Sequence, residues 1–227
     1  MKKAIFWDFD GTLVYSNHLW SGSLLRLITA QAPEKGITLG QVREHMKTGF
    51  TWHTPFDDHS HLVGELWWDN ILERMRVNCL LLGLDEATAQ TVADGMREEI
   101  TNNKNYELYP DAVEMLEFAS EKGYENYILS NNYPELRSVM EKLDLEKYFK
   151  GFTVSAELGF DKPRRELFEH ALKTADYPEH CFMVGDNPYA DVEGANSVGI
   201  PSVLVHNGTK SEATYTFKNL SDMKEIL

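Results

Sequence analysis

The sequence contains few cysteines, no long hydrophobic run and no excess of basic residues. Its only two cysteines, Cys79 and Cys181, lie in apolar stretches, so we expect buried thiols rather than a disulfide. No apolar run approaches the roughly 20 residues that a membrane-spanning helix needs. Asp8 and Asp10 interrupt the N-terminal apolar run, which is therefore too short and too acidic for a signal peptide. These features predict a cytoplasmic protein with no part in a membrane.

Basic residues are the minority among charged residues, with 22 Lys and Arg against 36 Asp and Glu, which gives a formal net charge of −14. A nucleic-acid binder needs a basic surface, and the sequence has no basic cluster, so we expect no nucleic-acid partner. The acidity is typical of a well-solvated surface. An anionic substrate would therefore depend on local positive charges, such as a metal ion and a few lysines or arginines.

Hydrophobic residues make up 42% of the 227 residues, which is enough for a sizeable core. From residue 110 onward, short apolar runs alternate with segments of helical periodicity. This alternation predicts a parallel sheet with helices on both faces, and residues near the N-terminus add one more strand. The expected strands are residues 4–7, 127–129, 152–154, 182–184 and 203–205.

The segment from residue 16 to residue 105 has a different pattern and contains no convincing strand. Apolar residues recur at helical spacing from Val63 to Leu82 and again from Ala89 to Ile100. Polar stretches bound the segment on both sides. We therefore predict a Rossmann-like α/β core domain from residues 1–15 and 106–227, with an inserted α-helical cap domain at 16–105.

Polar motifs follow four of the predicted strands or connections, where a parallel sheet binds its ligands. Each one alone also fits an ordinary turn or a helix N-cap. Lys162 is an exception, because a cation at a helix N-terminus is unfavourable unless an anion is bound there. Two carboxylates two residues apart fit a nucleophile and a proton shuttle. The motifs are residues 8–12 (DFDGT), 130–132 (SNN), 161–163 (DKP) and 185–191 (GDNPYAD).

In this order and spacing, the four motifs resemble those of the haloacid dehalogenase-like hydrolase superfamily, and the insertion resembles its helical type I cap. The resemblance implies a nucleophile at Asp8, an acid and base at Asp10, and charge balance by Lys162. Substrate phosphate would be held by Thr12, Ser130 and Asn131. It also implies a Mg²⁺ cofactor bound by Asp8, the Asp10 carbonyl and Asp186, with Asp191 supporting the metal site or bonding to it through water.

Asp10 favours phosphoryl transfer over carbon–halogen cleavage, because dehalogenating members of the family lack an acid or base at this position. The resemblance thus implies a phosphatase for a small phosphorylated metabolite, acting as a monomer or homodimer. A sugar-phosphate mutase of the same superfamily and a non-catalytic phosphate-binding regulatory protein remain alternatives. In the cap, residues 48–53 form a candidate specificity loop, with Arg43, Lys47 and His53 as possible substrate contacts. Trp67 and Trp68 are expected in the cap core.

Overall fold

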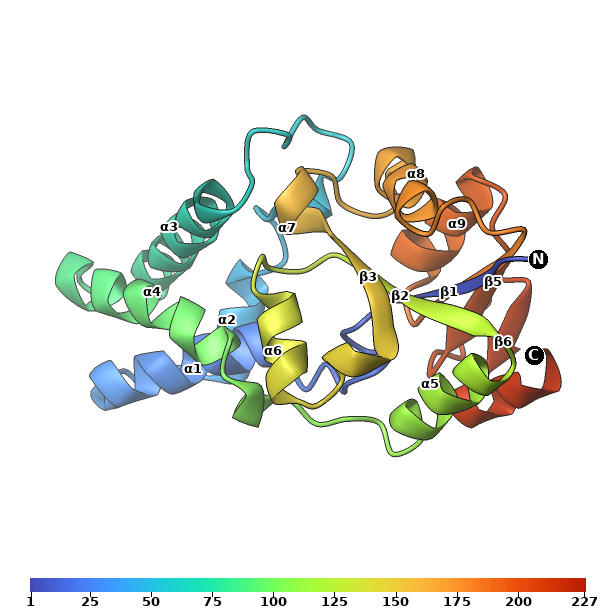
Figure 1. Cartoon of the computed structure of the whole chain (residues 1–227). Helices are drawn as coiled ribbons and strands as arrows, with labels where there is room; N and C mark the ends of the chain where they lie inside the picture. The colour runs from blue at the N-terminus through green and yellow to red at the C-terminus, as the bar shows by residue number, and fades with distance from the viewer.

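The computed structural model describes residues 1–227, and a sheet with its covering helices lies beside a group of inserted helices (Figure 1). Six parallel strands form one sheet in the order β3-β2-β1-β4-β5-β6. The predicted fold class and all five predicted strands are confirmed. The sixth strand escaped prediction because it is only three residues long and mostly exposed, so it has no buried apolar run. The strands are β1 Lys3–Trp7, β2 Tyr124–Ser130, β3 Phe149–Val154, β4 His180–Gly185, β5 Ser202–Val205 and β6 Tyr215–Phe217.

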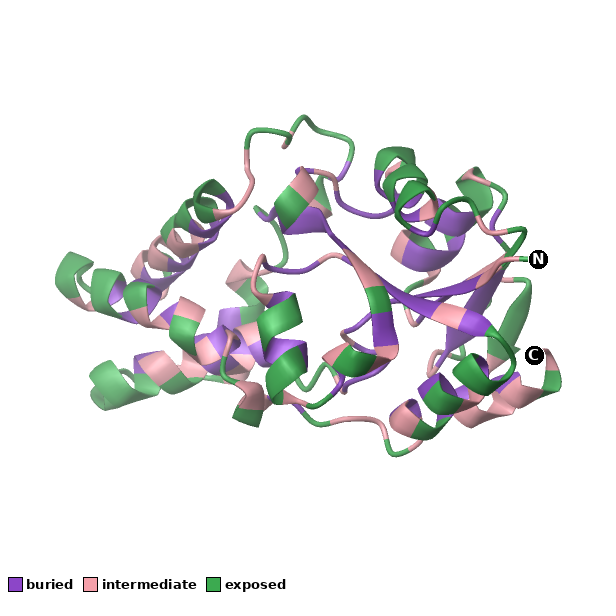
Figure 2. Ribbon diagram, in the orientation of Figure 1, coloured by how far each residue is buried: buried purple, intermediate pink, exposed green.

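Helices cover both faces of the sheet, which explains why its central strands are apolar throughout. Side chains of β1 alternate between the two faces: Ile5 and Trp7 join the larger hydrophobic cluster, and Ala4 and Phe6 join the smaller one. Strands therefore lie as a buried layer between helices (Figure 2). The larger cluster includes α5 Ala112–Glu121, α6 Leu136–Lys142 and η6 Leu220–Glu225, and the smaller one α8 Arg165–Thr174 and α9 Gly194–Ser197.

Inserted helices follow β1 and lie together at the left of Figure 1, and their buried residues share the larger hydrophobic cluster with the sheet. In it α3 packs against α4, and α1 packs against both α2 and α4. The predicted stripes are buried in α3 and α4, and the further helix α1 begins directly after the polar residues 16–18. The elements are α1 Leu19–Gln31, η1 Pro33–Lys35, α2 Leu39–His45, η2 Thr51–His53, α3 Glu65–Leu81, α4 Glu86–Ile100 and η3 Asn103–Asn105.

Two connections join the inserted helices to the rest of the chain, and they run side by side. The Tyr15 N–H donates to the Glu107 carbonyl at 2.8 Å, and the Tyr109 N–H donates to the Leu13 carbonyl at 3.0 Å. Asn17 and His18, just beyond this pairing, both have positive φ. The chain therefore turns sharply where it leaves the sheet and enters α1.

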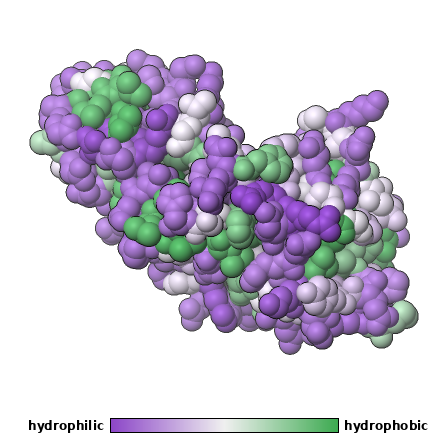
Figure 3. All heavy atoms as spheres, turned by 90° about the horizontal axis from the view of Figure 1, so that it is seen from above, coloured by the Kyte–Doolittle hydropathy of each residue, from purple (hydrophilic) through white to green (hydrophobic).

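Of the remaining short elements, one precedes β3 and two follow the carboxyl ends of β3 and β4. They are η4 Glu146–Tyr148, α7 Ser155–Leu158 and η5 Pro188–Glu193. None of the helices combines the length and the apolar character that crossing a membrane requires. Seen from above, two lobes meet at a waist, and most of the visible surface is hydrophilic (Figure 3). Neither cysteine forms a disulfide: Cys79 is buried as expected, whereas Cys181 is only half-buried.

Candidate active site

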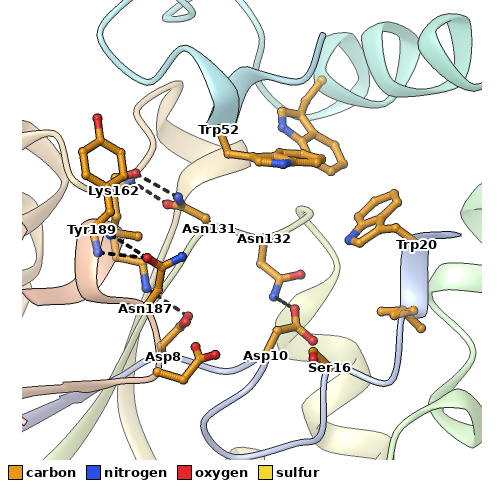
Figure 4. A pocket seen from close by; sticks show the side chains of 14 residues that line it. Asp8, Asp10, Ser16, Trp20, Trp52, Asn131, Asn132, Lys162, Asn187 and Tyr189 are labelled. Carbon is orange, nitrogen blue, oxygen red and sulfur yellow. Dashed lines mark hydrogen bonds and ion pairs between the residues drawn. The ribbon is translucent and has the colours of Figure 1, made fainter. Parts of the chain in front are cut away.

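A cavity of about 320 Å³ lies where the carboxyl ends of the central strands meet the inserted helices (Figure 4). Asp8 follows β1, Asn131 follows β2 and Asp186 follows β4, and β1 lies between β2 and β4 in the sheet. Residues far apart in the sequence are therefore brought together because parallel strands end at the same edge. The cavity is lined by Asp8, Asp10, Ser16, Leu19, Trp20, Trp52, Trp67, Asn131, Asn132, Lys162, Asp186, Asn187, Tyr189 and Ala190.

Lys162 is 2% exposed, and its ammonium group is surrounded by three acceptors. Its Nζ lies 2.6 Å from Asp191 Oδ1, 2.9 Å from Asp8 Oδ1 and 2.9 Å from the Leu129 carbonyl oxygen. Burial alone would lower the pKa of Lys162, but Asp191 and Asp8 outweigh burial and raise it. The side chain is therefore a fixed positive charge with all three hydrogens used.

Asp8 is held from one side only. Its Oδ1 accepts a hydrogen bond from the Ser130 hydroxyl at 2.7 Å and faces Lys162. Its Oδ2 receives no hydrogen bond from the protein. One oxygen of this carboxylate is thus oriented by a hydroxyl and an ammonium group, and the other is free to react or to bind a cation.

Asp10 lies in the same cavity and has a different environment. Its Oδ2 accepts a hydrogen bond from Asn132 Nδ2 at 2.8 Å, and its Oδ1 is buried without any partner. Burial, followed by the charge of Asp8, raises the pKa of Asp10 to about 7, although Asn132 and Lys162 act in the opposite direction. At neutral pH this carboxyl group can therefore both release and accept a proton.

The acidic residues provide oxygen ligands that suit a small divalent cation. Carboxylate oxygens of Asp8, Asp186 and Asp191 all lie within 4.8 Å of one another. Burial, then Asp8 and Asp191, raise the pKa of Asp186 to about 8, which shows that its negative charge is poorly compensated by protein groups. A cation would compensate it, and carboxylates with carbonyl oxygens are the ligands that Mg²⁺ prefers. The donor set therefore fits this metal.

Asp191 is less available as a direct ligand than Asp8 or Asp186. Its Oδ1 accepts from Lys162, and its Oδ2 accepts from the Asn187 N–H at 2.9 Å. Burial raises its pKa to about 6, although Lys162 lowers it. With both oxygens engaged, Asp191 fixes Lys162 and the loop after β4, and any link to a cation would be indirect.

Two glycines let the carboxylates approach the backbone closely. A Cβ on Gly11, which has a φ of +81°, would collide with the Asp186 carboxylate. A Cβ on Gly185 would likewise collide with the carboxylate of Asp191. The Asp-Gly and Gly-Asp pairs of the two motifs are thus required for the geometry of the site, beyond any need for a turn.

The predicted phosphate-binding residues have three different placements. Thr12 is fully buried, its hydroxyl has no partner, and it does not line the cavity. Ser130 is buried behind Asp8, to which it donates. Asn131 lines the cavity and binds the backbone of Lys162, accepting from its N–H at 2.6 Å and donating to its carbonyl at 3.1 Å. The structure therefore brings only Asn131 of these three to the cavity surface.

Sequence reasoning gave no role to Asn132, although it lies in the 130–132 motif, and of the aromatic wall it pointed only to Trp52, through the candidate specificity loop at 48–53. Asn132 orients Asp10, and its place directly after β2 could have identified it. The wall opposite the carboxylates consists of Trp20 from α1, Trp52 from η2 and Trp67 from α3, so the buried Trp67 also serves as cavity lining. For Trp67, helical periodicity accounts equally well for packing, so no local signal marks it as cavity lining.

A second cavity of about 350 Å³ adjoins the first and shares Trp20 and Trp52 with it. Arg43 and Lys47, which were expected as substrate contacts, line this second cavity instead of the first. His53 lines neither of them. These two cations therefore belong to an adjoining cavity that shares Ser16, Leu19, Trp20 and Trp52 with the first.

Comparison with known proteins places the whole arrangement in one family. A family model for haloacid dehalogenase-like hydrolases matches residues 2–199. The chain is 35% identical over 127 residues to a phosphoserine phosphatase of Thermus thermophilus, covering 54% of this chain and 51% of that protein. It is 26% identical over 230 residues to a glyceraldehyde 3-phosphate phosphatase of Pyrococcus furiosus, covering 97% of this chain and 87% of that protein.

The chain spans between half and three fifths of the length of the first two curated relatives it matches. Among solved structures, YfnB from Bacillus subtilis bound to magnesium superposes with a TM-score of 0.76 at 18% identity, covering 100% of this chain and 98% of that one. At this identity the likeness establishes the fold only.

Proposed function

This chain belongs to the haloacid dehalogenase-like hydrolases, and we propose that it is a Mg²⁺-dependent phosphatase that hydrolyses a small phosphomonoester through a transient phosphoryl group on Asp8. The observation that carries the proposal is the pair of carboxylates in one cavity. Asp8 has a free oxygen beside a buried ammonium group, and Asp10 has a pKa near neutral with one oxygen unpaired. The relatives named as phosphatases support the same reaction class.

In the first step, Asp8 Oδ2 attacks the phosphorus atom and the bond from phosphorus to the leaving oxygen breaks. Asp10 starts in its protonated form and gives its proton to that leaving oxygen, so the alcohol departs neutral. Asn132 holds Oδ2 of Asp10 during this transfer. Lys162 stays charged and stabilises the negative charge that builds up around Asp8 and the phosphoryl group.

In the second step, water cleaves the phosphorus–oxygen bond to Asp8. Asp10, now ionised, takes a proton from the attacking water, and the phosphoryl group leaves as inorganic phosphate. Asp8 returns to its carboxylate and Asp10 to its acid, so the cycle closes without net change. Asn132 and Ser130 keep the two carboxyl groups in place through both steps.

The residues that would hold Mg²⁺ are Asp8, the Asp10 carbonyl and Asp186, with Asp191 as a supporting residue through Lys162 and the loop after β4. Bound there, Mg²⁺ would neutralise part of the charge on the phosphate and the carboxylates. Without a cation, burial and the nearby Asp8 disfavour the ionised form of Asp186 and raise its pKa to about 8, and a bound cation would let both carboxylates ionise while a phosphate dianion approaches. A cation-dependent reaction follows from this imbalance.

We propose that residues 16–105 act as a cap over the cavity and that residues 1–15 and 106–227 form the core. The paired connections near Tyr15 and Glu107 and the positive φ of Asn17 and His18 are consistent with a hinge there. Closure over the cavity would exclude water during the first step, and it would place the indoles against the leaving group.

The proposed function is tested by measuring phosphate release from a panel of phosphomonoesters with and without Mg²⁺. Wild type should release phosphate only with Mg²⁺, and excess chelator should abolish release. Asp8→Asn keeps the shape of the side chain and should lose activity by at least a thousandfold. Asp176→Asn removes a carboxylate that is 87% exposed and should match wild type.

Full activity of Asp8→Asn would contradict the nucleophile assignment, and full activity in chelator would contradict the metal assignment. A product with its phosphoryl group moved within the same sugar, without free phosphate, would assign a mutase instead.

A further inference from the structure

Charged and apolar groups occupy opposite sides of the cavity. The four charged side chains that line it are Asp8, Asp10, Lys162 and Asp186, and all four come from segments outside the insert; Figure 4 shows Asp8, Asp10 and Lys162 across the cavity from Trp20. The inserted helices contribute only Ser16, Leu19 and three tryptophans to its lining. Within this cavity, the part of the substrate away from the phosphate therefore meets indole surface, and Arg43 and Lys47 line only the adjoining cavity.

The lining tryptophans also keep their polar atoms free. Of the five tryptophans, Trp7 donates to Asn126 at 2.9 Å and Trp68 donates to Glu135 at 2.8 Å. The N–H groups of Trp20, Trp52 and Trp67 donate to no protein atom, and none of them is among the buried polar atoms without a partner. Three indole N–H groups on lining residues thus remain without a protein partner.

Trp20 and Trp52 differ from tryptophans that serve the core alone. Trp68 is 1% exposed and tied to Glu135, whereas Trp20 and Trp52 are only partly buried. The ring of Trp52 stacks on Phe50 with centroids 4.6 Å apart and planes at 8°, and it meets Trp20 at 5.9 Å. These contacts hold the exposed faces rigidly, as a preformed binding surface requires.

From this wall we infer that the preferred substrates are phosphomonoesters whose leaving alcohol carries a flat aromatic ring, which lies against Trp20 and Trp52. The inference rests on the proposed function and adds the substrate class to it. A cavity of about 320 Å³ is at the small end for ligand sites, so it suits a single ring system and a short linker to the phosphate. The indole N–H groups can donate to acceptor atoms on such a ring.

Small, highly polar leaving groups fit this wall poorly. Phosphoserine carries an ammonium and a carboxylate near its phosphate, and a sugar phosphate carries several hydroxyls. Of the groups on the wall, only Ser16 and the indole N–H groups could bond to them, and the remaining polar atoms would lose their water without replacement. An aromatic ring instead gains contact with indole faces.

The test compares substrates that differ only in the ring. Uridine 5′-monophosphate and ribose 5-phosphate release the same primary alcohol group, so their chemistry at phosphorus is alike. A second pair, 2-phenylethyl phosphate and 2-cyclohexylethyl phosphate, compares a flat ring with a saturated one. Stacking on an aromatic side chain predicts kcat/KM at least tenfold higher for the ringed member of a pair. If the ringed member is preferred in both pairs, the substrate class is phosphomonoesters of aromatic alcohols in general. If it is preferred only in the first pair, the substrate class is nucleoside monophosphates.

Variants test whether Trp20 and Trp52 cause the preference for the ringed substrate. In Trp52→Ala and Trp20→Ala the ratio of kcat/KM between uridine 5′-monophosphate and ribose 5-phosphate should fall about tenfold, mainly through KM. Trp52→Phe should keep most of the ratio. Tyr177→Ala removes an aromatic side chain that is 67% exposed and outside the cavity, and it should leave both values unchanged. A variant that is merely unfolded loses both activities together and leaves the ratio as it was.

Binding to Asp8→Asn gives an independent result in the absence of turnover. With Mg²⁺ present, uridine 5′-monophosphate should bind at least tenfold more tightly than ribose 5-phosphate in calorimetric titration, and it should quench tryptophan fluorescence. Equal affinities, or equal kcat/KM for both members of both pairs in wild type, would overturn the inference while leaving the phosphatase assignment intact. Phosphate release equal in wild type and Asp8→Asn would instead refute the proposed function.

Discussion

The buried ion pair between Lys162 and Asp191 should contribute much more to stability than an exposed ion pair does. The two side chains are about 1% exposed, and their atoms lie 2.6 Å apart. At an effective dielectric constant of about 20, a pair at this distance attracts with about 6 kcal/mol before the cost of removing both charges from water. Replacing Lys162 with Met keeps the side-chain length and removes only the charge and its hydrogen bonds.

Lys162→Met leaves two carboxylates, Asp8 and Asp191, close together without their shared cation. Breaking a buried pair from one side costs about 3 to 5 kcal/mol, because the remaining charge stays buried or must take up a proton. For a chain of this size, 1 kcal/mol corresponds to about 2 to 4 °C in Tm, so we expect a decrease of roughly 10 °C. Turnover should also fall by at least a hundredfold, because Lys162 no longer stabilises charge around Asp8.

The double variant Lys162→Met/Asp191→Asn separates the two roles. Asn keeps an oxygen for the Asn187 N–H and carries no charge, so the double variant should regain about 2 kcal/mol over Lys162→Met. Its activity should remain as low as that of Lys162→Met. Lys147→Met is a matched control, because Lys147 pairs with Asp144 at 2.6 Å on an exposed surface and should cost about 0.5 kcal/mol or less.

Thermal and urea unfolding in excess chelator, followed by tryptophan fluorescence, would provide the four free energies of the double-mutant cycle. Chelator is needed so that metal binding does not add to the folded state of some variants. A loss below about 1 kcal/mol in Lys162→Met would refute the reasoning. A double variant whose loss is the sum of the two single losses would refute it too, because additivity would mean that the pair does not interact.

Three further predictions concern pH, the proton donor and the cap. In metal-free protein the pKa of Asp186 is raised to about 8 and that of Asp10 to about 7. Between about pH 4 and 8 the folded state therefore binds more protons than the unfolded chain. As the pH rises through this range, the free energy of unfolding should fall by up to about 1.4 kcal/mol per pH unit per group. Mg²⁺ should restore more stability at pH 8 than at pH 5.5. Asp186→Asn should make the free energy of unfolding depend less steeply on pH, and an unchanged slope in this variant would contradict the raised pKa of Asp186. Asn132→Leu removes the hydrogen bond that lowers the pKa of Asp10, so the alkaline limb of the pH profile of kcat should move to higher pH. If the limb does not move, it does not report the deprotonation of Asp10. Arg97 bonds to Glu65 on α3 and to Glu135 before α6, so Arg97→Met should cost about 1 kcal/mol in thermal unfolding. The control is Arg165→Met, since Arg165 bonds to Glu169 and to the Ser197 carbonyl, both outside the insert; a cost in Arg97→Met no greater than in this control would contradict a bridge between insert and core.

The parallel sheet could be predicted from the sequence because its strands are buried on both faces. Such strands appear as short, nearly continuous apolar runs, and residues 4–7 and 127–129 are clear examples. The strand β6 has no such run, since it lies at the sheet edge and is mostly exposed. Helices α3 and α4 were predictable for a similar reason, because each presents one apolar stripe to its neighbours.

The order of motifs at strand ends likewise determined which side chains meet. Asp8, Lys162 and Asp186 come from three separate segments, yet the rule that parallel strands end at one edge brings them together. The position of Thr12 did not follow from this rule. Its hydroxyl lies in the protein interior, because the turn at Gly11 sets the direction of the next side chain.

Only the tertiary structure decided what faces the carboxylates. Trp20, Trp52 and Trp67 come from three elements of the insert; Trp67 fits the stripe of a packed helix, Trp52 falls in the predicted specificity loop at 48–53, and Trp20 belongs to a helix that was not predicted. Whether an indole contacts another helix or an open cavity depends on how the insert sits on the sheet edge. Periodicity records which face of an element is apolar, and the packing of distant elements determines whether protein or ligand covers that face.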